Sequence, residues 1–200
     1  MEHFTAVILA AGEGTRMKSD TPKVLHKVCG LPVLTHIIEA TRRAGAEKIV
    51  VVVGKDAEEI KEAYAKDDIE FVVQKERKGT GHALMQAESA AQGSSHFVVL
   101  YGDMPMVTAE SIEGMARFHR EQKAAATVMT AKVSDPTGYG RIIREGNKVL
   151  DIREHKDATP KERAINEINA GFYCFDTSLV FSALSKVENK NRQGEYYLTD

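Results

Sequence analysis

The sequence lacks an excess of charge of either sign, because 27 lysine and arginine residues nearly balance 29 aspartate and glutamate residues. A formal net charge of −2 gives no general attraction to nucleic acids or to anionic membranes. No apolar run approaches membrane-spanning length, and the N-terminus has no basic patch before an apolar core, as a signal peptide would. We therefore expect a cytoplasmic protein without nucleic-acid or membrane partners, in which any anion site is a local cluster of cations.

Cysteine is also scarce: Cys29 and Cys174 are far apart and form no C-x-x-C pair. Both are expected to be buried thiols in a reducing compartment rather than a disulfide or a metal pair. The seven histidines form no H-x-x-H or H-E-x-x-H pattern, which argues against zinc. The sequence offers no convincing pair of nucleophile and general base, so nothing points to covalent catalysis.

The first part of the chain alternates apolar runs of strand length with helical patterns. Two hundred residues, 42% of them hydrophobic, suit one domain with a substantial core, and no internal repeat or low-complexity linker is visible. On the first helix the apolar positions share one face, and Glu39 can pair with Arg43 on the other. The alternation predicts a Rossmann-like α/β fold, a mostly parallel sheet with helices on both faces. The expected strands are 6–11, 48–53, 69–73 and 96–100, and the expected helices are 33–44, 57–65, 81–92 and 109–122, the last capped by Thr108.

The second part changes character and predicts a smaller antiparallel insertion that could close over a ligand. A strand is expected over 124–133, and strands 142–145 and 149–153 flank Gly146-Asn147 as a hairpin. Residues 155–168 are polar and irregular, 169–175 form a strand, and Thr177 is expected to cap a helix that extends to Val187. Residues 194–200 are expected to begin a further helix, so we expect residues 1–200 to be a single domain that is incomplete at its C-terminus.

The loop after the first strand has the composition of a phosphate site. Ala10, Ala11 and Gly12 have short side chains, so a ligand can lie against their backbone N–H groups. Arg16 and Lys23 follow as cations that suit a phosphate chain. Neither G-x-G-x-x-G nor the P-loop motif fits, because each would need a glycine at position 17. The alternative is a glycine-rich turn with surface cations.

Two further segments follow the ends of predicted parallel strands, where ligands bind in such sheets. Asp103 comes after a buried strand and Gly102, a position that suits Mg²⁺, although it could equally cap the turn that follows. Gln74 opens a segment with Gly79 and Thr80, and its amide offers the donors and acceptors that a uracil edge needs. Without further information, a charged mobile loop is the simpler reading of that segment.

The stretch L-A-A-G-E-G-T-R-M followed by P-K-V-L-H resembles the signature of the sugar-nucleotide pyrophosphorylases. It is most similar to the bacterial N-acetylglucosamine-1-phosphate uridylyltransferases, which form the first half of bifunctional enzymes that also acetylate glucosamine 1-phosphate. Four other segments fit the same family in order: Q-K-E-R-K-G-T-G-H-A, Y-G-D, G-Y-G-R with E-H-K-D-A, and E-I-N-A-G. The resemblance covers essentially the whole chain and implies the nucleotide-diphospho-sugar transferase type of fold.

The resemblance implies that UTP and N-acetyl-α-D-glucosamine 1-phosphate react to UDP-N-acetylglucosamine and pyrophosphate, a step of cell-wall precursor synthesis. It implies Mg²⁺ as cofactor, with Asp103 as the metal ligand. Arg16 and Lys23 would be catalytic, and Gly140, Glu154 and Asn169 would contact the sugar. The residues implied in nucleotide binding are Leu9, Ala10, Ala11, Gly12, Lys23, Gln74, Gly79, Thr80, Tyr101, Gly102 and Asp103.

In that family a second metal ligand, an asparagine, would lie beyond Asp200, where the nucleotidyltransferase domain continues. The resemblance implies that a left-handed β-helix acetyltransferase domain follows and makes the whole protein a homotrimer. No hexapeptide repeat occurs in these residues, so we expect no acetyltransferase activity here. Three alternatives stay open: a sister enzyme that uses another sugar or nucleotide, an inactive fragment that binds nucleotide sugars, and a purely structural domain.

Overall fold

The sheet is built around β1, a strand in which all seven residues, Phe4–Ala10, are buried. β4 (Ala46–Val53) and β6 (His96–Tyr101) flank it in parallel, and β5 (Glu70–Val73) extends the sheet beyond β4. This computed structural model describes residues 4–14 and 17–200. The four strands predicted in the first part of the sequence are therefore confirmed, as is their parallel arrangement.

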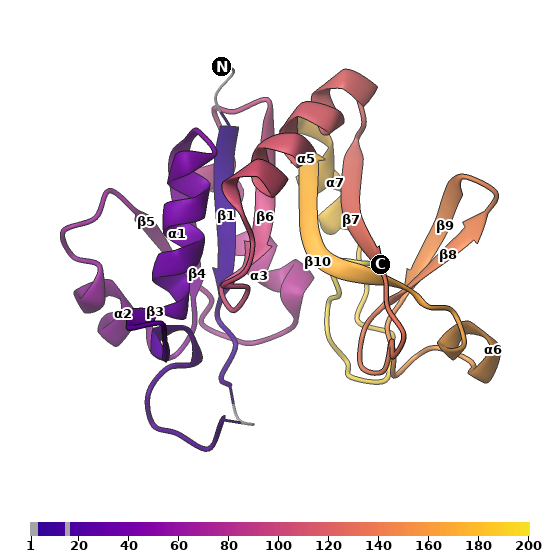
Figure 1. The fold of residues 1–200 in the computed structure, drawn as a ribbon, viewed down its shortest axis with the longest axis horizontal. Helices are drawn as coiled ribbons and strands as arrows, with labels where there is room; N and C mark the ends of the chain where they lie inside the picture. The colour runs from indigo at the N-terminus through magenta and orange to yellow at the C-terminus, as the bar shows by residue number, and fades with distance from the viewer. Residues whose placement is uncertain (1–3, 15–16) are drawn as a thin grey trace.

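Helices cover both faces of the parallel strands (Figure 1). One face packs against α1 (Val33–Arg43), α2 (Ala57–Ala63) and α5 (Ala109–Gln122). The other packs against α3 (Thr80–Gln86), α4 (Glu88–Ala91) and α7 (Thr177–Leu184). Successive side chains of a strand point to opposite faces, so Ile8 lies in the first core and Val7 in the second. The two-sided burial explains why these strands are continuous apolar runs.

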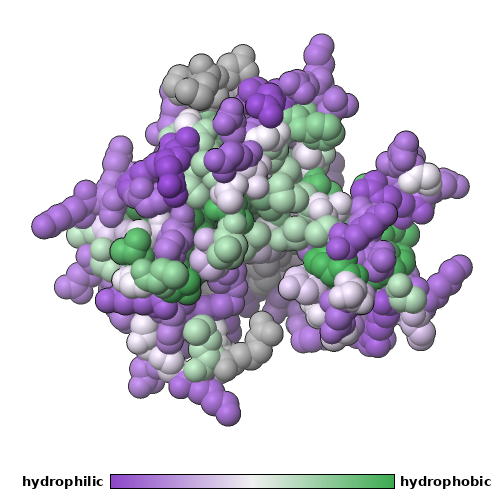
Figure 2. All heavy atoms as spheres, viewed as in Figure 1, coloured by the Kyte–Doolittle hydropathy of each residue, from purple (hydrophilic) through white to green (hydrophobic). Residues whose placement is uncertain are grey.

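The antiparallel part continues the same sheet. β10 (Glu167–Asp176) pairs with β6 and carries both β7 (Ala126–Lys132) and β8 (Arg141–Glu145). β8 forms the predicted hairpin with β9 (Lys148–Arg153), and β10 bends toward this hairpin in Figure 1. The register of β10 with β7 shifts between Asn169 and Tyr173. Figure 2 shows the surface notched between the parallel half and the part that carries the hairpin. The remaining short elements are η2 (Lys23–Leu25), β2 (Lys27–Val28), β3 (Leu31–Pro32) and α6 (Pro160–Arg163).

Three helix predictions need correction. The expected helix 81–92 is two helices, because Ala87 is buried and its N–H bonds to the carbonyl of Leu84, at 2.9 Å, in a tight turn. Thr177 is the first residue of α7 rather than its cap; the carboxylate of Asp176 accepts the N–H of Ser178 at 2.9 Å. α6 was missed, although a capping box at its start was present in the sequence. None of the helices among residues 4–14 and 17–200 is long and apolar enough to cross a membrane.

The segment 195–199, called here the terminal segment, does not begin a helix as predicted. Backbone groups of Tyr196 and Leu198 bond to the start of α3, and those of Glu195 bond to the side chain of Asn191. Tyr196 donates its N–H to the carbonyl of Lys78 at 2.7 Å and accepts that of Gly81 at 2.9 Å. Leu198 donates to the hydroxyl of Thr80 at 3.1 Å. These bonds join positions more than a hundred residues apart, so local pattern could not reveal them.

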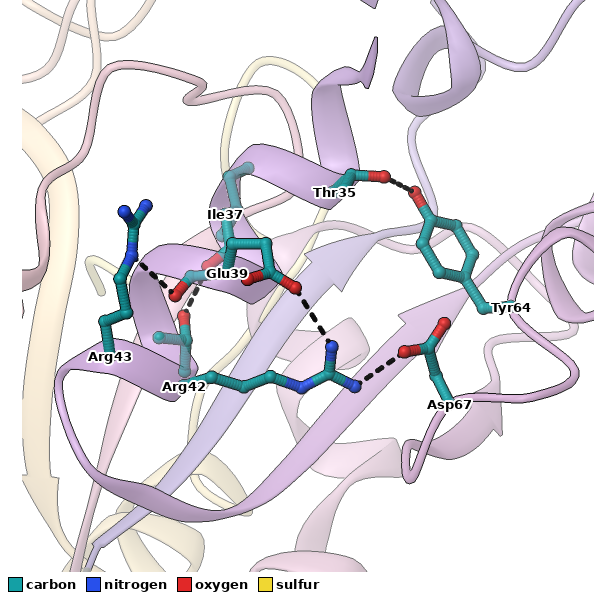
Figure 3. Close-up of polar contacts among 8 residues, drawn as sticks. Thr35, Ile37, Glu39, Arg42, Arg43, Tyr64 and Asp67 are labelled. Carbon is teal, nitrogen blue, oxygen red and sulfur yellow. Dashed lines mark hydrogen bonds and ion pairs between the residues drawn. The ribbon is translucent and has the colours of Figure 1, made fainter.

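The outer surface of α1 carries a small ionic network, shown in Figure 3. Arg42 reaches the carboxylate of Asp67, beyond α2, at 2.7 Å and that of Glu39 at 3.2 Å. The predicted pairing of Glu39 with Arg43 is therefore wrong, because Arg43 donates to the backbone carbonyl of Glu39 instead. Arg42 is the better placed partner, since it can bond to carboxylates of two elements at once.

The two cysteines lie in different surroundings. Cys174 in β10 is buried, as predicted, and burial raises the pKa of its thiol to about 12. Cys29 is exposed, so the prediction of a buried thiol is wrong there. It stands in the turn between β2 and β3, with a φ of 51°, where the chain reverses and no core is near.

Candidate functional site

A cavity of about 340 Å³, the first pocket, opens beyond the carboxyl ends of β1, β5 and β6. Every residue that the sequence analysis assigned to nucleotide binding lines it, except Gly102. The parallel topology brings these residues together, because the carboxyl ends of neighbouring strands meet at one edge. Four residues that sequence reasoning did not assign also line it: Val24, Arg77, Ala83 and Glu195.

Gly102 supports the pocket from below rather than lining it. Its N–H donates to the carbonyl of Leu9 at 2.8 Å, which continues the ladder between β6 and β1. A Cβ atom at this position would lie only 3.0 Å from the Cβ of Ala10 and 3.1 Å from a methyl group of Val24. A side chain at this position would therefore force Ala10 and Val24 to shift, whereas glycine lets β6 lie close to the end of β1.

Basic side chains in the described part of the first pocket are paired with carboxylates. Lys23 forms an ion pair with Asp103, and both side chains are partly exposed. Arg77 lies 3.0 Å from Glu13, which stands between the two glycines of the first loop. Exposed pairs of this kind are weak, so an entering anion can take the place of the carboxylate. Arg16 lies outside the described residues, and its catalytic role stays a prediction.

A second pocket of about 350 Å³ adjoins the first, on the side of the antiparallel strands. The three predicted sugar contacts, Gly140, Glu154 and Asn169, all line it. It shares two wall residues with the first pocket, Tyr101 and Asp103. Ligands in the two pockets would therefore meet at the end of β6.

Asn169 is held on both sides of its amide. Its oxygen accepts the N–H of Gly171 at 3.0 Å, and its nitrogen donates to the hydroxyl of Tyr173 at 2.6 Å. Its backbone N–H bonds to the carbonyl of Gly140 at 2.9 Å, which joins the two sides of the pocket. An amide can donate two hydrogen bonds and accept two, so one of each is left for a ligand.

Glu154 faces the second pocket from a partly buried position. Burial raises the pKa of its carboxyl group, the hydroxyl of Thr199 opposes this by donating to it at 3.1 Å, and the nearby Asp200 and Asp157 raise the pKa further. An acceptor held in such surroundings is suited to bind hydroxyl groups of a ligand.

The site residues that sequence reasoning missed belong to two kinds. Val24, Arg77 and Ala83 lie inside segments that the sequence analysis had singled out, but the direction of their side chains could not be read from the sequence. Glu195 and Thr199 come from the terminal segment: Glu195 lines the first pocket, and Thr199 bonds to Glu154 in the wall of the second. No local signal could have identified them.

Comparisons with known proteins indicate the family of the chain. Residues 6–166 match the family model of the MobA-like NTP transferase domain. The chain is 48% identical over 196 residues to the bifunctional protein GlmU of Clostridium botulinum. The aligned region covers 98% of this chain and 43% of that protein. It is 48% identical over 202 residues to the bifunctional protein GlmU of Halalkalibacterium halodurans, with 100% and 44% covered. The chain thus spans less than half the length of these curated relatives.

Solved structures share the fold. A crystal structure of UDP-glucose pyrophosphorylase complexed with UDP-glucose superimposes with a TM-score of 0.79 at 21% identity, covering 100% of this chain and 85% of that one. A putative glucose-1-phosphate thymidylyltransferase from Bacillus anthracis gives a TM-score of 0.74 at 24% identity, with 92% and 75% covered. At these identities the comparison concerns the fold alone, and it agrees with the predicted mixed sheet.

Proposed function

Because this chain belongs to the MobA-like NTP transferase family, we propose that its two adjoining pockets transfer a nucleotidyl group to a sugar 1-phosphate. The reaction proposed is that of UTP with N-acetyl-α-D-glucosamine 1-phosphate, which yields UDP-N-acetylglucosamine and pyrophosphate. The identity of 48% to proteins named bifunctional GlmU, over the whole chain, supports this choice.

The observation that carries the proposal is the shared wall of the two pockets. A nucleotide seated against the backbone of Leu9–Gly12 would extend its phosphates toward Lys23 and Asp103. A sugar phosphate held by Glu154 and Asn169 would approach the same carboxylate from the other side. The reacting groups would therefore meet at the end of β6.

The chemistry needs positioning rather than a protein nucleophile. A phosphate oxygen of the sugar phosphate attacks the α-phosphorus in line, the new O–P bond forms, and the bond to pyrophosphate breaks. The backbone N–H groups at the end of β1 orient the nucleotide, and Lys23 and Arg16 neutralise the charge that builds up on the leaving pyrophosphate. The ammonium group of Lys23 can bind the phosphates when they replace the carboxylate of Asp103 as its partner.

The residues present fit a magnesium ion. Asp103 offers a carboxylate at the junction of the pockets, where it pairs with the ammonium group of Lys23. Mg²⁺ prefers one or two carboxylates together with phosphate oxygens and water. Bound there, it would supply charge neutralisation to both substrates. Residues 4–14 and 17–200 contain no cluster of three or more His, Cys, Asp or Glu side chains suited to a metal. Phosphate oxygens of the substrates, together with the asparagine that the family resemblance implies beyond Asp200, would complete the ligand set.

We also propose that residues 1–200 belong to one nucleotidyltransferase domain. The acetyltransferase activity and the trimeric assembly implied by the family resemblance would then belong to the part of such proteins that this chain does not match.

The test is pyrophosphate release from pairs of nucleotides and sugar phosphates with Mg²⁺, beside calorimetric binding of UTP. Release that is fastest with UTP and N-acetylglucosamine 1-phosphate supports the proposal. Preference for glucose 1-phosphate or dTTP would indicate a sister enzyme, and UTP binding without release a binding fragment.

Arg16→Ala should lower turnover about a hundredfold and raise the KM for UTP far less, because the guanidinium acts where charge develops. Arg117→Ala, on the exposed side of α5, is the matched control and should change neither quantity. Unchanged turnover with only a higher KM for UTP would contradict the role given to Arg16.

A further inference from the structure

Gln74 stands at the point where β5 enters the first pocket. Its backbone N–H continues the sheet by donating to the carbonyl of Val53 at 2.8 Å, so its position is set by the core. The residue is only 4% exposed, yet it lines the pocket. Its amide group can face the pocket with an acceptor or with a donor, and the two choices recognise different ligands.

The surroundings of the amide decide between these two choices. The nitrogen lies 3.2 Å from the carbonyl oxygen of Gly79, which can only accept a hydrogen bond. A flipped amide would bring two oxygens together there. The same nitrogen lies 2.9 Å from Nδ1 of His82. Nδ1 must therefore accept, which places the ring proton of a neutral His82 on Nε2.

The competing contact at the second ring nitrogen is much longer. The Gln86 amide nitrogen is 3.5 Å from Nε2, against 2.9 Å between the Gln74 nitrogen and Nδ1, and it also donates to the carbonyl of His82 at 3.3 Å. The shorter contact decides that Nδ1 is the acceptor. Within the described residues, no hydrogen bond reaches the side-chain oxygen of Gln74. That oxygen is left for a ligand in the pocket.

His82 is kept neutral by its surroundings. Burial is the main cause that lowers its pKa, the ammonium group of Lys78 lowers it further, and the carboxylate of Glu76 acts in the opposite direction. From the terminal segment, the ring of Tyr196 packs at a centroid distance of 6.3 Å. Near neutral pH the ring can therefore accept the Gln74 hydrogen bond.

We propose that His82 is a positioning residue for base specificity: together with the Gly79 carbonyl, it fixes the Gln74 amide so that its oxygen faces the nucleotide base. A base edge with a ring N–H, as in uracil, can then donate to Gln74. Cytosine presents a ring acceptor at the matching position and would face the oxygen without a hydrogen bond. This inference rests on the proposed binding of a nucleotide in the first pocket.

Protonation of His82 would remove the acceptor at Nδ1 and place a second donor against the Gln74 nitrogen. The amide would lose this support, and its oxygen would no longer be held toward the base. The preference for UTP over CTP should therefore decline as the pH falls through the pKa of His82, which lies below the ordinary histidine value. The phosphates are common to both nucleotides, so their own titration cancels in the ratio.

The test is calorimetric binding of UTP and of CTP to the chain. The wild type should bind UTP roughly 10- to 100-fold more tightly than CTP. His82→Leu should reduce this ratio roughly tenfold, whereas His82→Asn should retain part of it, because its amide oxygen can replace Nδ1. His36→Asn on α1 is the control and should leave the ratio unchanged. The ratio is insensitive to partial unfolding, since both nucleotides meet the same folded population.

A titration from about pH 8 to about pH 6 adds a readout that a merely structural role would not move. In the wild type the ratio should decrease as the pH is lowered, whereas in His82→Asn it should not change with pH. For the wild type, ¹⁵N chemical shifts should report an unprotonated Nδ1 near neutral pH. Equal binding of UTP and CTP by the wild type, or an unchanged ratio in His82→Leu, would overturn the inference. A UTP preference without pyrophosphate release would instead overturn the proposed function alone.

Discussion

The parallel and antiparallel halves of the sheet hold their pockets in different ways. In the parallel half, β1 and β6 are buried almost throughout, and the first pocket begins where their backbones end. In the antiparallel half, β7 and β9 are largely exposed or half-buried, and the walls of the second pocket are tied by side-chain hydrogen bonds. The first pocket is thus a product of core packing, and the second of a polar network.

This difference predicts how the two halves respond to substitution. Changes in the parallel core should lower the free energy of unfolding without a specific effect on either ligand. Changes in the antiparallel half should alter ligand binding more than stability, unless they reach a residue that both pockets share. Tyr101 is such a residue, since it lines both.

The largest effect is expected from Gly171→Ala. Gly171 has a φ of 74°, and an added Cβ would lie 2.5 Å from the ring of Tyr101. Backbone strain and overpacking together should lower the free energy of unfolding by about 3 kcal/mol, measured by urea denaturation. The control is Gly146→Ala in the β8–β9 turn, where φ is 59° and no atom lies within 4 Å. It should cost about 1 kcal/mol. Equal losses in the free energy of unfolding for the two variants would show that the ring of Tyr101 can move to accommodate the added methyl group.

A smaller effect is expected from Val51→Ala in β4. Val51 is fully buried between helices and neighbouring strands, so the loss of two methyl groups should lower the free energy of unfolding by about 2 kcal/mol. Val149→Ala in β9, where the side chain is 38% exposed, should change it by less than about 0.5 kcal/mol. Similar losses at both sites, measured by urea denaturation, would remove the distinction between the halves.

The smallest change in stability is expected from Glu154→Gln, and its sign depends on pH. Burial raises the pKa of the carboxyl group above its unfolded value, so the stability contributed by Glu154 is complete below that value and is lost as pH rises through the folded pKa. The variant should therefore be more stable than the wild type near neutral pH but not in acid, as followed by thermal unfolding.

The same variant should raise the KM for the sugar phosphate about fivefold and leave the KM for UTP unchanged, because a charged acceptor becomes a neutral amide. Glu145→Gln, exposed at the end of β8, is the control. A higher KM for UTP in Glu154→Gln would mean that the two pockets are not separable in this way.

The sequence alone predicts the parallel half well, for a physical reason. Two-sided burial makes each strand an apolar run, and topology then places Gln74, Tyr101 and Asp103 at one edge. Sequence reasoning failed where a long-range contact overrides the local pattern. In the terminal segment, Tyr196 and Leu198 form backbone hydrogen bonds with the start of α3 instead of beginning a helix, and Cys29 lies in a turn outside the core.

The same reasoning explains what sequence could say of the candidate site. Residue types at strand ends indicated the first pocket, whereas the residues of the second were implied only by the family resemblance. Nothing in the pattern shows that Gly140 and Asn169 meet across β8 and β10. The pairing of Arg77 with Glu13 was equally hidden, because it depends on the direction in which two loops leave the sheet. The site roles themselves stay predictions, to be tested by the substitutions above.

Two successive residues of the terminal segment join the pockets mechanically. Leu198 is bonded to Thr80 in the wall of the first pocket, and Thr199 is bonded to Glu154 in the wall of the second. A substrate that displaced this dipeptide from one pocket would therefore disturb the wall of the other. Linkage makes such an influence reciprocal: the factor by which bound nucleotide alters the affinity for sugar phosphate equals the factor in the reverse direction.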